Sequence, residues 1–166
     1  MSEAVLVAVG AAVVSGIGIA YKVKDTDISF DKNKKGSIKN WVRLIEGAQD
    51  RLNAVTDFDP DVFENGDVLS AVLDLARKRA EIRFVYDTGS VPTSYQQLLA
   101  QRKINIARAK PLLCYFAVAD GLSCRVETHE PYGDKTSLSY WGFPNYAGSL
   151  EEKFWDLDLL EPFAKV

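Results

Sequence analysis

The chain has 166 residues, a formal net charge of −3 at pH 7 and an isoelectric point near 5.2. This length suffices for one domain with a substantial core, and the slight negative charge argues against a nucleic-acid partner. One histidine and two cysteines, Cys114 and Cys124, lack metal-ligand spacing, so we expect neither a metal nor a cofactor. The cysteines fit a reduced setting better than a disulfide, although a bridge between them stays open.

Residues 4–21 form an uncharged apolar run, AVLVAVGAAVVSGIGIAY. As a helix with a rise of ~1.5 Å per residue it would span about 27 Å, close to the ~30 Å of a bilayer core. Small residues recur at every fourth position: Ala4, Ala8, Ala12, Gly16 and Ala20. A face of small residues lets helices approach closely, so the run predicts a membrane anchor that packs against itself or another subunit.

Positive charge follows this run and none precedes it; the lysines are Lys22, Lys24, Lys32, Lys34 and Lys35. The positive-inside rule then predicts an outside N-terminus and a cytoplasmic C-terminal domain. Two alternatives stay open. A cleaved signal peptide is disfavoured because no positive residue precedes the run, and a soluble core element is the other.

The sequence therefore predicts an anchor over residues 1–24, a polar linker over 25–36 and one α/β sandwich domain over 37–166. Apolar periodicity predicts helices over residues 38–52, 68–79 and 95–104 and from Gly148 to Leu160, and strands over 53–58, 82–86, 106–109, 112–118, 124–128 and 138–141. Helices and strands that alternate in this way are typical of a layered α/β fold.

Three segments of this domain resemble one half of a phospholipase D-like domain. They are the helix and strand over 41–58, the stretch VLSAVLDLARKRAEIRFVYD over 68–87, and CYFAVADG over 114–121. The later CRVETH, GFPNYAGSL and EEKFWDLD also resemble family segments, so the likeness covers residues 36–166. The third segment resembles the strand and turn that hold the family's H-x-K-x4-D signature.

With Asp120 as the signature aspartate, the lysine position falls on Tyr115 and the histidine position on Leu113. The family's chemistry needs a histidine nucleophile and a lysine that stabilises phosphoryl charge, and neither is present. The resemblance therefore implies a catalytically silent relative. We expect a non-catalytic binding or scaffolding module, in a homo-oligomer or a larger membrane complex.

The alternative function is a membrane-tethered phosphodiesterase or nuclease that uses His129, Lys135 and Asp120. His129 is the only histidine, so a two-histidine site would need a second chain. The aromatic turn with Trp141, Phe143 and Tyr146 is either core or a partner patch. Asp57, Asp59 and Asp61 could bind a cation, but caps and turns are their favoured use.

Overall fold

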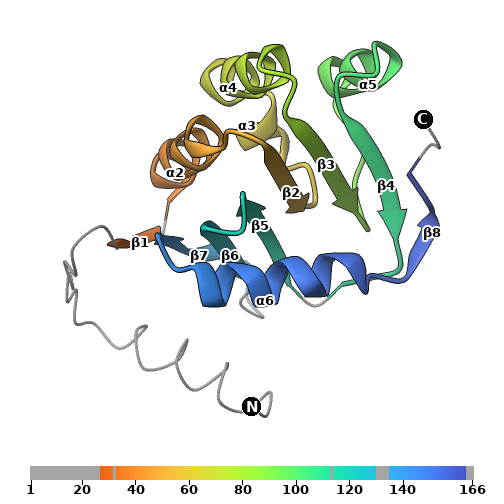
Figure 1. Ribbon diagram of the computed structural model, residues 1–166. Coiled ribbons are helices and arrows are strands. Elements are labelled where there is room, and N and C mark those ends of the chain that lie inside the picture. Colours follow the sequence, from red (N-terminus) through yellow and green to blue (C-terminus); the bar gives the residue numbers. More distant parts are fainter. Residues whose placement is uncertain (1–26, 32, 113, 130–134, 164–166) are drawn as a thin grey trace.

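The computed structural model describes residues 27–31, 33–112, 114–129 and 135–163. In this part of the chain eight strands form one mixed sheet, in the order β1-β7-β6-β5-β2-β3-β4-β8 (Figure 1). The strands are β1 (Asp27–Asp31), β2 (Arg51–Val55), β3 (Glu81–Tyr86), β4 (Asn105–Ala109), β5 (Tyr115–Ala119), β6 (Ser123–His129), β7 (Lys135–Trp141) and β8 (Leu159–Glu161). The helices are α2 (Lys34–Gly47), α3 (Pro60–Phe63), α4 (Gly66–Arg77), α5 (Thr93–Ala100) and α6 (Pro144–Trp155).

The sheet separates two helical layers. Figure 1 shows α2, α3, α4 and α5 on one side and α6 on the other. Strands β2, β3 and β4 are parallel and are connected through helices, as parallel strands require, whereas β5, β6, β7 and β1 pair antiparallel.

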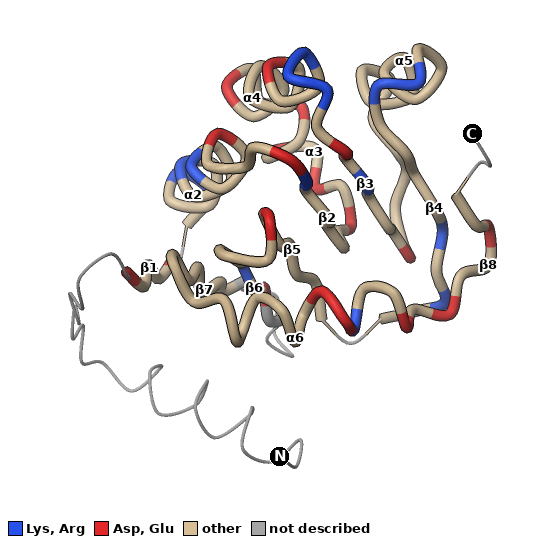
Figure 2. Tube along the Cα trace, viewed as in Figure 1, with Lys and Arg blue, Asp and Glu red and all other residues tan. Residues whose placement is uncertain are grey.

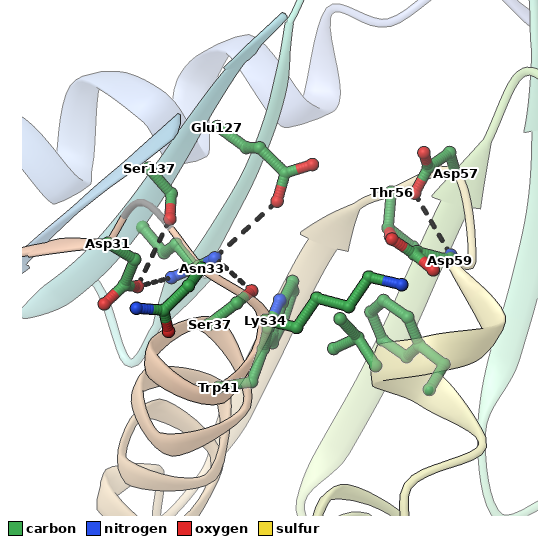
Figure 3. A pocket seen from close by; sticks show the side chains of 13 residues that line it. Asp31, Asn33, Lys34, Ser37, Trp41, Thr56, Asp57, Asp59, Glu127 and Ser137 are labelled. Atoms are coloured by element: carbon green, nitrogen blue, oxygen red, sulfur yellow. Dashed lines mark hydrogen bonds and ion pairs between the residues drawn. The ribbon is translucent and has the colours of Figure 1, made fainter. Parts of the chain in front are cut away.

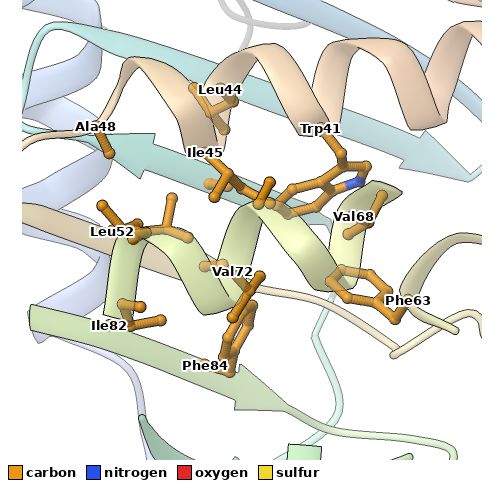
Figure 4. Packing of buried hydrophobic residues seen from close by; sticks show 14 of the residues in the cluster. Trp41, Leu44, Ile45, Ala48, Leu52, Phe63, Val68, Val72, Ile82 and Phe84 are labelled. Atoms are coloured by element: carbon orange, nitrogen blue, oxygen red, sulfur yellow. The ribbon is translucent and has the colours of Figure 1, made fainter. Parts of the chain in front are cut away.

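The larger core lies between the sheet and the layer that contains α2 and α4 (Figure 4). Ile45 of α2, Leu52 of β2 and Val72 of α4 are fully buried there. Phe84 of β3 and Phe63 of α3 pack edge to face, with ring centroids 6.1 Å apart. Every helix of this layer buries apolar side chains against β2 and β3. This packing fixes the position of the strand ends, where the candidate site lies.

Several predicted elements are confirmed. Helix α4 begins at Gly66, because the side chain of Asn65 caps it by accepting a hydrogen bond from the amide of Asp67. Strand β3 and the hairpin between β5 and β6 also lie where the sequence places them. The last helix begins at Pro144 rather than Gly148, since proline suits the first helical turn, and Leu160 belongs to β8.

The prediction of a linker over residues 25–36 is wrong. Residues 27–31 form β1, which pairs with β7, and α2 already begins at Lys34. Asn33 caps this helix by accepting from the amide of Gly36, so Ser37 lies inside it. Asp27, Ser29 and Asp31 share one face of β1, and the partners of Asp31 in β6 and β7 lie far along the chain, which is why local periodicity missed the strand.

The transmembrane part of the expected fold class is also wrong for the described chain. None of the helices in the described ranges is long and apolar enough to cross a bilayer. The predicted span itself lies outside the described residues, with its small-residue positions and with Lys22, Lys24 and Lys32. The structure supports a mixed α/β domain, and the orientation across a membrane stays a prediction.

Candidate functional site

A row of polar side chains runs across four strands of the sheet. Asp31 of β1 lies in register with Ser137 of β7, Ser137 with Glu127 of β6, and Glu127 with Tyr115 of β5. Arg125 lies two residues before Glu127 and therefore shares its face of the sheet. Strand pairing thus assembles charged groups from remote parts of the sequence.

Arg125 lies at the centre of this row and is 2% exposed. Its Nη1 donates to Asp31 Oδ2 over 2.7 Å, and its Nη2 donates to Ser37 Oγ over 2.6 Å (Figure 3). Glu127 Oε2 lies 3.6 Å from Nη2. A buried charge needs such pairing, yet Arg125 Nε has no hydrogen-bond partner among the described residues.

Asp31 is held from three sides. Besides Arg125, its carboxylate accepts from Asn40 Nδ2 over 2.8 Å and from Ser137 Oγ over 3.2 Å. The network connects β1, α2, β6 and β7. It therefore stabilises the fold and also forms one wall of the candidate site.

A cavity of about 420 Å³ opens beside this network. Its lining comes from the β1–α2 junction, the inner face of β6 and β7, and the loop after β2: Asp31, Asn33, Lys34, Ser37, Trp41, Thr56, Asp57, Asp59, Val62, Phe63, Arg125, Glu127 and Ser137 (Figure 3). The volume is typical of small-molecule sites, and the carboxyl ends of parallel strands are where open α/β sheets bind ligands.

The acidic loop after β2 is shaped by its own aspartates. Asp57 Oδ1 accepts from the amide of Asp59, and Asp59 Oδ1 accepts from the amide of Asp61 to cap α3. Pro60 occupies the first turn of this helix. The prediction that these aspartates act in caps and turns is therefore confirmed for Asp57 and Asp59. Both residues also line the cavity. Within the described ranges, no group of three or more His, Cys, Asp or Glu side chains could hold a metal ion.

Tyr115, which the sequence resemblance aligns with the lysine of the family's signature, is bound to neighbouring polar groups. Its hydroxyl donates to Asp87 Oδ1 over 2.9 Å and lies 3.2 Å from Thr88 Oγ1. Burial raises the pKa of Tyr115 to about 12, with the nearby charge of Asp87 acting in the same direction. At neutral pH this position therefore carries no charge. Leu113 lies outside the described residues.

Asp120 is a structural residue at the turn between β5 and β6. Its carboxylate accepts hydrogen bonds from the amides of Gln49, Asp50 and Arg51, over 2.7, 3.0 and 2.7 Å. Its φ of +53° is one that aspartate tolerates better than most residues. The side chain thus fastens the α2–β2 connection to the hairpin, at the end of β5 opposite Tyr115.

The alternative catalytic residues do not converge. His129 and Lys135 are in register at the far end of the β6–β7 pair. Asp120 lies just before β6 begins, and at ~3.3 Å per residue the length of β6 separates it from His129 by roughly 20 Å.

The aromatic turn after β7 does not form one exposed patch. Trp141 is buried, its Nε1 donates to Ser29 Oγ over 3.1 Å, and the guanidinium of Arg43 lies 4.1 Å from its ring centroid. Tyr146 is half-buried and packs on Tyr140, with centroids 4.7 Å apart. Phe143 is also half-buried.

Sequence reasoning missed Arg125, Asp31 and Ser137. The signal that could have found them is the polar alternation along β6 and β7, where Arg125, Glu127, Ser137 and Ser139 share one face. Because β6 packs under α2, a polar face of this strand buries charged side chains, and buried charges need partners.

Comparisons with known proteins give the fold. No protein-family model matches the sequence, and no curated protein matches it. Among solved structures, the phospholipase D family member Nuc from Salmonella typhimurium is similar with a TM-score of 0.60 at 12% identity, over 82% of this chain and 98% of that one. NucT from Helicobacter pylori is similar with a TM-score of 0.63 at 8% identity, over 82% and 99%.

TrmBL2, an archaeal chromatin protein whose structure shows a novel mode of DNA binding, is similar with a TM-score of 0.64 at 9% identity. The match covers 93% of this chain but 58% of TrmBL2. At these identities the likeness shows the fold alone. The domain has a phospholipase D-like fold, as the resemblance of its segments predicted.

Proposed function

We propose that this domain is a non-catalytic ligand-binding module, in which the cavity beside Arg125 receives a small molecule. The support is a cavity of ligand size whose walls come from four separate segments and whose charged centre is held rigidly. Preorganised walls of this kind reduce the ordering cost of binding.

The main support for the absence of catalysis is that Tyr115 is uncharged at neutral pH. Phosphoryl transfer needs cations that stabilise charge on the phosphoryl oxygens. Where the family's signature has lysine, this chain has a neutral phenol bound to a carboxylate. A carboxylate at that place repels a phosphodiester. We therefore infer that the domain keeps the fold but lacks the positive charge that would stabilise a phosphoryl group.

DNA binding, named for TrmBL2, is not carried over to this chain. Basic residues gather on α2, which carries Lys34, Lys35, Lys39 and Arg43 against Glu46, and at the end of α4, but Asp and Glu lie on the same helices (Figure 2). The net charge is negative, whereas binding to the phosphate backbone draws on clustered positive charge.

Amide chemical-shift mapping of the full-length protein against a library of small metabolites tests the binding function. We expect the ligands that bind to shift amides of residues 56–59 and 125–127. Shifts confined to other surfaces, such as the outer sides of α4 and α5, would contradict the proposal.

One observation favours a second candidate, a phosphodiesterase. His129 and Lys135 occupy paired register positions at the end of β6 and β7, and a nucleophile and a cation on neighbouring strands are what such an enzyme needs. This function requires hydrolysis that disappears in His129→Ala while the fold is retained. Self-association and membership of a larger complex stay predictions.

A further inference from the structure

We propose that the edge of the sheet opposite the cavity carries a docking site for a short acidic segment of a partner protein. The site is formed by the ends of α4 and α5 and is called here the basic edge; its residues are Arg77, Lys78, Arg79, Arg102 and Lys103. It lies at the amino ends of β3 and β4, whereas the cavity lies at the carboxyl end of β2. The proposal therefore goes beyond the binding function of the cavity and does not depend on it.

Strand pairing brings the two parts of the basic edge together. β3 and β4 are parallel neighbours, with Arg83 in register with Asn105. The residues that follow α4 lead directly into β3 and those that follow α5 lead into β4, so both groups lie at the same end of two strands about 4.8 Å apart. Figure 2 shows Lys and Arg at both of these helix ends. All five side chains are exposed.

Most of this positive charge is available to a partner. The carboxylates on the same segments are already engaged, since Asp74 binds Arg77 over 2.5 Å and Glu81 binds Arg83. Among the described residues, the other four cations of the basic edge have no ion pair or side-chain hydrogen bond.

Both helix ends hold an arginine in the left-handed region of backbone conformation. The angle φ is +63° at Arg79 and +54° at Arg102. Glycine is the usual residue at this position after a helix, because a side chain there is strained. Two neighbouring helix ends therefore carry a cation where glycine would fold more easily.

The helix dipole explains only part of this arrangement. Cations stabilise the last turn of a helix, which accounts for Arg77 and Lys78. A cation one residue before Arg102 would serve the dipole of α5 without strain, yet Gln101 occupies that position. Strained residues that a fold retains cluster at functional sites, so the strain favours a binding role for these arginines.

The chemistry of the basic edge fits carboxylates. Three of its five cations are arginines, and a guanidinium can bind a carboxylate through two parallel hydrogen bonds. Clusters of arginine are a recurring means of recognising acidic motifs.

The neighbouring surface limits the length of the partner segment. Beyond β3, the end of α2 and the loop after it carry the exposed carboxylates of Glu46 and Asp50, and the carbonyl of Asp50 accepts from the amide of Glu81 over 2.8 Å. A long polyanion such as DNA would extend over these carboxylates. A segment of about six residues, roughly 20 Å when extended, covers two neighbouring helix ends without reaching further.

The basic edge also lacks what other anionic partners use. The exposed large apolar side chains of the described chain all lie outside it: Ile28, Phe30, Leu122, Trp155 and Leu160. Bases of a single strand therefore find no aromatic side chain to stack on, and a membrane finds no apolar side chain to take up. These observations favour a peptide over a nucleic acid or a lipid surface.

Binding of labelled probes to the full-length protein tests the partner class. The probes are hexaglutamate, its neutral counterpart hexaglutamine and a thymidine hexanucleotide, measured by fluorescence anisotropy, and phosphatidylserine vesicles, measured by sedimentation. We expect hexaglutamate to bind most tightly and hexaglutamine not to bind. Raising the salt from about 50 to about 300 mM should weaken hexaglutamate binding about tenfold, because these exposed charges are screened.

Glycine variants separate binding from folding. Arg79→Gly and Arg102→Gly should each weaken hexaglutamate binding about three- to tenfold. Their unfolding midpoints should equal or exceed that of the wild type, because glycine tolerates the positive φ. Arg79→Ala should weaken binding as much as Arg79→Gly without raising the midpoint. The double variant Lys35→Ala/Lys39→Ala removes two exposed cations of α2 and is the matched control for the double glycine variant. It should bind as the wild type does.

Absence of hexaglutamate binding at millimolar concentration, or equal binding of hexaglutamine, would overturn the proposal. Unchanged binding in the glycine variants, or an equal loss in the double lysine variant, would also overturn it, because the basic edge would then have no special part. Tighter binding of the hexanucleotide or the vesicles would assign the basic edge to a nucleic acid or a membrane instead. The amide shifts of residues 56–59 and 125–127 report on the cavity separately.

Discussion

Arg125 Nη1 and Asp31 Oδ2 lie 2.7 Å apart, in side chains that are 2% and 7% exposed and 94 residues apart in sequence. This pair attaches β1, the edge strand of the sheet, to the centre of the domain. It also forms one wall of the cavity. The stability of the domain and the shape of the cavity therefore depend on the same contact.

We expect Asp31→Ala to lower the free energy of unfolding by about 3–5 kcal/mol, because it leaves the guanidinium buried without its main partner. Urea denaturation followed by circular dichroism measures this loss. In the double variant Asp31→Leu/Arg125→Met, both charges leave together, so the loss should be smaller than the sum of the single losses.

A surface pair on the same strand, β1, provides the control. Arg43 Nη1 lies 3.0 Å from Asp27 Oδ2, but both side chains are nearly half exposed. Asp27→Ala should therefore cost no more than about 1 kcal/mol. Equal losses in Asp27→Ala and Asp31→Ala would contradict the importance of the buried pair.

Asp120 should matter for stability, since its carboxylate accepts three backbone amides. Asp120→Ala should destabilise the domain by about 3 kcal/mol, and Asp120→Asn by about half as much, because an amide oxygen still accepts. Asp120→Gly separates hydrogen bonding from backbone strain, since glycine tolerates the positive φ. If the glycine variant is as stable as the wild type, the turn conformation alone explains the aspartate.

The domain should lose stability at alkaline pH. Burial raises the pKa of Tyr115 and of the Cys124 thiol to about 12, and it also raises the pKa of Tyr95, Tyr140 and Tyr146. Between the ordinary values of 9–10 and these raised values, the unfolded chain releases protons that the folded chain retains. The free energy of unfolding should therefore fall as pH rises from about 9 to 12.

Denaturant titrations at a series of pH values measure this slope. Tyr115→Phe removes one contributor, so its slope should be shallower above pH 10. It should also cost about 1–2 kcal/mol at neutral pH, because Asp87 loses a donor. An unchanged slope would show that the Tyr115 hydroxyl titrates normally.

The two thiols should differ in reactivity. Cys114 is exposed and Cys124 is buried, and both are free. A maleimide at pH 7.5 should label Cys114 alone, slowly because partial desolvation of its sulfur raises the pKa of the thiol, and Cys124 only after unfolding. Mass spectrometry of the labelled protein counts the adducts. Absence of labelling in denaturant without reductant would reveal a disulfide instead.

The sequence predicted local elements well where apolar periodicity coincides with a cap, as in α4 after Asn65. It failed for β1, because the buried side chain of this strand, Asp31, is a carboxylate that is stabilised by Arg125 far along the chain. The cavity could not be predicted for the same reason: strand order brings Asp31, Arg125 and Asp57 together, and no sequence spacing encodes that order. Asp120, in contrast, is followed by Gly121, and this pair is typical of a turn in any sequence.

Hydrolysis of bis(4-nitrophenyl) phosphate by the purified full-length protein tests the absence of catalysis most directly. We predict a rate equal to that of buffer alone, with or without added divalent cations, and the same rate for His129→Ala. A rate above buffer that co-purifies with the wild type and is lost in a folded His129→Ala variant would contradict the account and make the domain a phosphodiesterase.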